Sequence, residues 1–161
     1  MALTVGTDAY ETLANVRSYW ADRGDTAWAL LSDATAEVYI RKATDYVDRN
    51  YSFIGDKATA AQRLKWPRKN AEVESFAIAE DEVPWQVEEA TAQIAELYRV
   101  GTVDLEGIVT NDEAATSMTK VDVITVQYDT SRRLQGSAIP SHVIELLRPL
   151  ITSTNGGLLR A

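Results

Sequence analysis

The residues with the clearest capacity for chemistry lie in the stretch Arg63-Leu64-Lys65-Trp66-Pro67-Arg68, which Lys69 follows. An aromatic ring among basic side chains can stack on a nucleic-acid base while the cations hold phosphates, as in single-strand-binding platforms. Pro67 restricts the backbone of Trp66, and a large apolar side chain in such a loop commonly packs onto a neighbouring helix. We therefore expect Trp66 to be buried, with base stacking as the alternative.

Other chemical constellations are lacking in the sequence. His142 is the single histidine, and there is no cysteine to act as a nucleophile or to form a disulfide. The ligand spacings of zinc sites and EF-hands are absent, and Gly156-Gly157 lacks the Lys-Ser/Thr that follows a phosphate loop. We predict that the chain is not an enzyme and uses no metal or cofactor.

Charge is unevenly distributed along this acidic chain. The formal net charge is −8 and the pI is about 4.7, which weighs against autonomous nucleic-acid binding. Five of the 16 basic residues fall between positions 57 and 69, and an acidic segment, 72–89, follows. Segregated charge suits an interface. The candidate interface residues are a basic group, Arg63, Lys65, Trp66, Arg68 and Lys69, and an acidic group, Glu80, Asp81 and Glu82.

Length and composition predict one ordinary globular unit. The chain has 161 residues, of which 45% are hydrophobic and 25% charged. It has no secretory leader and no run of roughly 18 apolar residues that could span a membrane, so we expect a soluble protein made in a reducing cytoplasm. We predict a domain at residues 1–151 and a flexible tail at 152–161. Leu158 and Leu159 make that tail a candidate docking element.

Apolar residues recur at helical spacing in four stretches. Three of them begin at residues that favour helix starts, and a glycine or proline marks the end of three. A short helical segment or loop around Trp28 should connect the first two. The four predicted helices run from Thr12 to Gly24, from Ser32 or Asp33 through Val47, from Pro84 to Gly101, and over 139–150 with Pro149 ending or bending the last.

The remaining sequence predicts long loops and a little β-structure. Residues 51–78 and 102–117 show no sustained periodicity, whereas Val121 to Tyr128 alternates as a strand does. A single strand needs a partner, either a hairpin mate near 116–120 or a strand from a neighbouring subunit. The expected fold is therefore mainly α, a small helical bundle with long loops and a short β-hairpin or strand near the C-terminal half.

Several of these segments resemble one family. The element Leu64-Lys65-Trp66-Pro67-Arg68, the opening Val5-Gly6-Thr7-Asp8-Ala9-Tyr10, the run Glu82-Val83-Pro84 and the strand Val123 to Tyr128 occur in the order seen in DnaT-like single-stranded-DNA-binding proteins of tailed phages. These proteins resemble head-to-tail connector adaptors. The resemblance extends over roughly the whole chain.

The resemblance implies a structural virion protein made in the host cytoplasm and located at the head–tail interface. Such an adaptor forms a homo-oligomeric ring, expected to be a dodecamer, beneath the portal protein. It links the portal to a neck or tail protein and acts by binding only. Genomic DNA would pass its channel without sequence-specific contact, and no membrane is involved. The alternative is a DnaT-like single-stranded-DNA-binding protein that uses the basic loop around Trp66.

Overall fold

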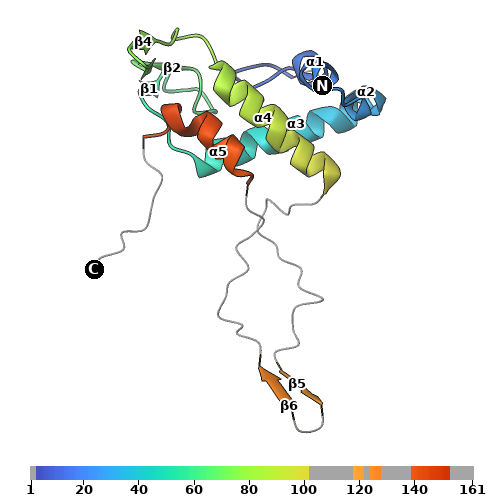
Figure 1. Cartoon of the computed structure of the whole chain (residues 1–161). Helices are drawn as coiled ribbons and strands as arrows, with labels where there is room; N and C mark the ends of the chain where they lie inside the picture. The colour runs from blue at the N-terminus through green and yellow to red at the C-terminus, as the bar shows by residue number, and fades with distance from the viewer. Residues whose placement is uncertain (1–2, 102–117, 122–123, 128–138, 153–161) are drawn as a thin grey trace, which may run out of the picture.

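A computed structural model describes residues 3–101, 118–121, 124–127 and 139–152. The fold is mainly α with short antiparallel strand pairs, as predicted (Figure 1). The predicted loop at 102–117 and all of the predicted tail except Thr152 lie outside the described residues. Within the described part of the chain, no helix combines the length and apolar character that crossing a bilayer requires.

The first two helices form one corner of the domain. Helix α1, Leu13–Asp22, begins where the Thr12 side chain accepts a hydrogen bond from the backbone N–H of Asn15, and it ends before Gly24 at φ 80°. Helix α2, Ala27–Leu30, is the predicted short segment, and its Trp28 is fully buried. The indole N–H of Trp28 donates to Glu96, 2.7 Å away in a later helix. The ring of this tryptophan is therefore buried while its polar N–H is hydrogen-bonded.

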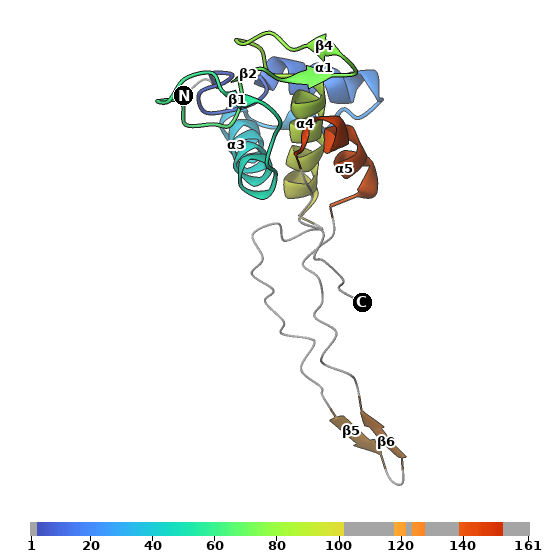
Figure 2. The same ribbon diagram turned by 90° about the vertical axis from the view of Figure 1, so that its left-hand side faces the viewer.

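Two long helices form the centre of the core. Helix α3, Asp33–Asn50, is capped by Ser32, and helix α4, Trp85–Val100, follows Pro84 and ends at Gly101, which has a left-handed φ of 68°. The two helices pack on each other, and α4 also contacts helix α5, Ser141–Leu147 (Figures 1 and 2). Their predicted apolar stripes are confirmed as buried at Ala36, Ile40, Ala43 and Val47 in α3 and at Val87, Ala90, Thr91 and Ile94 in α4.

The segment predicted to be irregular, 51–78, holds two very short antiparallel pairs. Strand β1, Asp56–Lys57, pairs with β2, Arg68–Lys69, and β3, Glu72–Val73, pairs with β4, Phe76–Ala77. Strands of two residues leave no periodicity to detect, so the sequence did not indicate them. Gly55 has φ 73°, and a Cβ there would lie 2.5 Å from the carbonyl oxygen of Lys69, so the close approach of β1 to β2 needs a glycine.

The predicted hairpin and last helix are both present. Strand β5, Met118–Val121, pairs with β6, Ile124–Gln127, so the hairpin mate lies close to where it was expected. In both views this hairpin lies apart from the helices (Figures 1 and 2). Helix α5, Ser141–Leu147, passes into a 3₁₀ turn, η1, Arg148–Leu150, at Pro149. Ile151 then forms a bridge with Phe53, which returns the chain to the core.

Candidate functional site

The tryptophan of the basic loop is part of the core. Trp66 is fully buried, and its ring meets Phe53 edge-on with 5.6 Å between centroids and 63° between planes. Its indole nitrogen is buried and has no hydrogen-bond partner within the part of the chain that the structure describes. A base can stack only on an exposed ring face, so Trp66 cannot serve as the aromatic platform in this conformation. The expectation that Trp66 anchors the loop is confirmed.

A polar pair, the buried Tyr10 and the half-buried Asp48, holds this loop in place. The hydroxyl of Tyr10 donates to the carboxylate of Asp48 in α3 and accepts from the backbone N–H of Lys65 at 3.1 Å. Asp48 also accepts from that N–H, at 2.7 Å. Burial, and then the hydrogen bond to the Asp48 carboxylate, raise the pKa of Tyr10 far above its usual range, so the hydroxyl keeps its proton. Two of the stretches that carry the family resemblance, the N-terminal entry and the tryptophan loop, therefore meet here.

The basic residues of the loop divide into two kinds. The guanidinium of Arg68 donates to the carbonyl oxygens of Ile54 at 2.7 Å, of Lys65 at 3.1 Å and of Gly55. The ammonium of Lys65 donates to the carbonyl of Tyr51 at 2.7 Å. These cations satisfy backbone acceptors, so binding a phosphate would cost them those bonds.

The other two basic candidates, Arg63 and Lys69, differ from each other in exposure. The Arg63 side chain is 73% exposed and lies 3.7 Å from Asp45 of α3, a pair of little energetic weight at this exposure. Lys69 is half-buried in β2. The structure thus brings the predicted basic group together in one loop, but only Arg63 and Lys69 lack hydrogen bonds from their side chains to backbone carbonyls among the described contacts.

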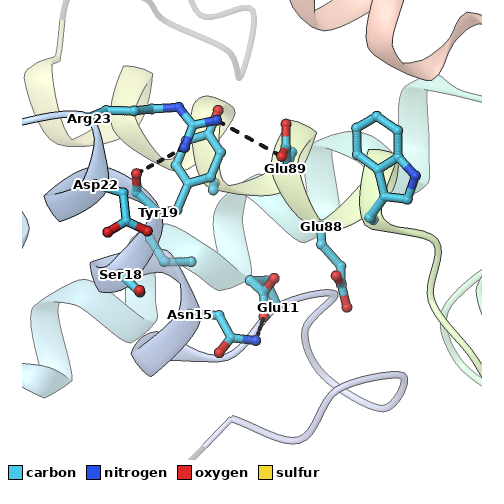
Figure 3. A pocket seen from close by; sticks show the side chains of 11 residues that line it. Glu11, Asn15, Ser18, Tyr19, Asp22, Arg23, Glu88 and Glu89 are labelled. Atoms are coloured by element: carbon cyan, nitrogen blue, oxygen red, sulfur yellow. Dashed lines mark hydrogen bonds and ion pairs between the residues drawn. The ribbon is translucent and has the colours of Figure 1, made fainter.

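The acidic candidates lead into α4. Glu80, Asp81 and Glu82 are exposed. Farther along, Glu88 lines a hollow of about 360 Å³ between α1 and α4, in which Figure 3 shows Arg23 directed toward Glu89 at 4.0 Å. No group of acidic or histidine side chains among the described residues could hold a metal ion.

One carboxyl group in this hollow has a strongly shifted pKa. Burial, and then the charges of Glu11 and Glu82, raise the pKa of Glu88 to about 7. The neighbouring Glu11 carboxylate accepts two hydrogen bonds at its Oε1, from the backbone N–H of Thr12 at 2.6 Å and from the side-chain amide of Asn15 at 2.9 Å. Glu88 has no comparable hydrogen bond among the described contacts, so desolvation dominates its pKa.

Sequence reasoning missed a second surface feature, formed by two exposed aromatic rings. Phe76 in β4 is 77% exposed, and Trp85 at the start of α4 is 57% exposed. Both line a groove of about 530 Å³ that Leu146 and Pro149 complete from the C-terminal helical segment. Large apolar side chains are ordinarily predicted to be buried, so their residue types gave no hint. Glu74-Ser75 is not one of the dipeptides that mark a tight hairpin, so the sequence carried no signal for the turn that exposes Phe76.

The remaining candidates, Leu158 and Leu159, lie outside the described residues. Taken together, the described residues form a small helical domain with a basic loop held by internal hydrogen bonds, an acidic hollow and an exposed aromatic groove.

Comparison with known proteins gives the family. The family model described as "Putative DnaT-like ssDNA binding protein" matches residues 2–161, and the chain belongs to this family. No curated protein and no solved structure matches the chain.

Proposed function

We propose that this chain is a head-to-tail connector adaptor of a tailed-phage virion, which assembles into a ring beneath the portal and acts by binding only. The observation that carries the proposal is the contrast between the basic loop around Trp66 and the exposed aromatic groove. The loop that could have been a nucleic-acid platform has its aromatic ring and two of its cations engaged internally. The exposed apolar side chains instead lie in a groove with acidic neighbours.

Charge supports the same function. DNA carries about one negative charge per 1.7 Å of duplex, so a ring of chains with net charge −8 would repel a passing genome instead of holding it. A conduit requires that property. The acidic residues at the start of α4, Glu80, Asp81 and Glu82, would line the channel or the rim facing the portal. The exposed Arg63 and the half-buried Lys69 would pair with acids of a neighbouring subunit or partner protein.

The hairpin gives a further reason to expect a partner. An isolated two-stranded hairpin is marginally stable in water, and β5–β6 lies apart from the helices in both views (Figures 1 and 2). Its stability would rise if it packed against another subunit. The isolated chain should accordingly be monomeric or weakly associated, with the ring forming on the portal.

Mass measurement tests this assembly directly. Light scattering at micromolar concentration should give a monomer or a weak oligomer for the chain alone. Mixing with portal rings of the same phage should give a discrete complex with a fixed number of adaptor copies. A stable dodecamer without portal would contradict templated assembly, and no complex with portal would contradict the connector function itself.

Single-stranded-DNA binding is the second candidate, because the family description names it. Arg63 and Lys69, the two loop cations without side-chain bonds to backbone carbonyls among the described residues, would then hold phosphates without help from Trp66. We expect no measurable binding of a labelled oligonucleotide at physiological salt. Submicromolar binding that weakens steeply with salt, and that is lost in Arg63→Ala/Lys69→Ala, would overturn the adaptor-only function. This double variant spares Lys65 and Arg68, whose loss would disturb the loop.

A further inference from the structure

The aromatic groove has the shape of a docking site for an apolar segment. It lies between the β3–β4 turn, the start of α4 and the end of the α5–η1 segment. Phe76 and Trp85 are the most exposed of its rings, at 77% and 57%, and Leu146 and Pro149 line it as well. Side chains of this size left in water are unfavourable unless something covers them.

The backbone holds Phe76 in its exposed position. Val73 pairs with Phe76 across a two-residue turn formed by Glu74 and Ser75, whose φ values are 52° and 71°. Turns with positive φ at both central residues favour glycine or asparagine, so this turn is an unfavourable local conformation for Glu-Ser. The core contacts of the domain do not explain it, because Phe76 is not packed into the core.

The rim of the groove selects for a positive charge. Glu74, Glu82 and Glu145 are exposed and line it. Glu145 forms an ion pair with Arg148, at 2.8 Å. Among the described residues, neither Glu74 nor Glu82 forms an ion pair. An occupant should therefore combine apolar side chains with one basic residue and carry no acid.

The end of the chain has this composition. Segment 153–161 contains two leucines, one arginine and no acidic side chain, whereas segment 102–117 carries four acids. It also starts beside the groove, because Pro149 lines the groove and Thr152 is held by a hydrogen bond of 2.9 Å to the carbonyl of Ser52. The six residues that follow Thr152, up to and including Leu158, can span about 20 Å.

We propose that Leu158 and Leu159 of the chain's own C-terminal segment dock in this groove, with Arg160 facing Glu74 and Glu82. A short tether within one chain gives an effective concentration in the millimolar range, so the same chain's segment occupies the groove in preference to a neighbour's at micromolar protein. The free chain thereby covers Phe76 and Trp85 until a partner competes for them. This inference does not depend on the connector function.

Disulfide trapping in the full-length chain tests the proposal, because the natural sequence has no cysteine. Ala79 lines the groove, and Ala161 follows the docking residues, so Ala79→Cys/Ala161→Cys leaves both leucines in place. Under mild oxidation at low micromolar concentration, this variant should form an intramolecular disulfide, read as a monomer by non-reducing electrophoresis and mass spectrometry. The control pair, Ala29→Cys/Ala161→Cys, places the first cysteine at an exposed position of α2.

The groove pair should cross-link about tenfold or more faster than the control pair. Adding Leu158→Ser/Leu159→Ser should bring its rate down to the control level while the melting temperature stays that of the parent pair. Equal rates for the two cysteine pairs, or a rate unaffected by the serine changes, would overturn the docking. Disulfide-linked dimers as the main product would overturn docking within one chain and assign the groove to a neighbour's segment.

Discussion

Replacing Trp66 by alanine should destabilise the fold strongly, because the side chain is fully buried against Phe53. A buried tryptophan removes about 200 Å² from water, which at about 25 cal/mol per Å² is worth about 5 kcal/mol. Residual structure in the unfolded chain reduces that value, and so does the unpaired indole N–H, whose loss relieves a buried orphan donor. We therefore expect Trp66→Ala to lower the free energy of unfolding by about 3–5 kcal/mol.

Urea denaturation followed by circular dichroism measures this change, and thermal melting should show a drop of about 10 °C or more. Trp66→Phe keeps a ring against Phe53 and removes the unpaired donor, so it should cost only about 1–2 kcal/mol. Leu30→Ala is the matched control, since Leu30 is 86% exposed and its truncation should change stability by less than about 0.5 kcal/mol. A Trp66→Ala variant that unfolds like the parent would refute the burial of Trp66 and revive base stacking.

Two further variants test the polar groups of the domain. Tyr10→Phe removes the hydroxyl that donates to Asp48. In urea denaturation at pH 7 it should lower the free energy of unfolding by about 1–3 kcal/mol. An unchanged urea midpoint would show that water replaces the hydroxyl. Glu88 has a folded-state pKa of about 7, above the ordinary value near 4.5, so the folded chain binds the extra proton and its stability falls as pH rises between those values. Glu88→Gln should remove this fall in stability and should be more stable than the parent at pH 8. The expected difference is only about 1 kcal/mol, because solvent screens the half-buried carboxylate. At pH 4 the two proteins should be equally stable, and parallel stability curves from pH 4 to 8 would contradict the shifted pKa of Glu88.

The sequence by itself determined the features that depend on neighbours a few residues away. Thr12 and Ser32 cap helices that begin next to them, and Gly101 ends α4 in the left-handed conformation that glycine tolerates. The buried stripes of α3 and α4 follow from helical spacing alone. The strand at 124–127 was visible as alternation, and a mate close to it could be expected because hairpins join adjacent strands.

Only the tertiary structure decided how the candidate residues are used. Arg68 is equivalent to Arg63 in residue type, yet it donates to carbonyls 13 and 14 residues earlier in the chain, at Gly55 and Ile54. Trp66 and Trp85 have the same side chain, but one is enclosed in the core and the other is 57% exposed. Burial and hydrogen bonding of this kind depend on segments brought together from distant positions, so residue type and local spacing do not fix them.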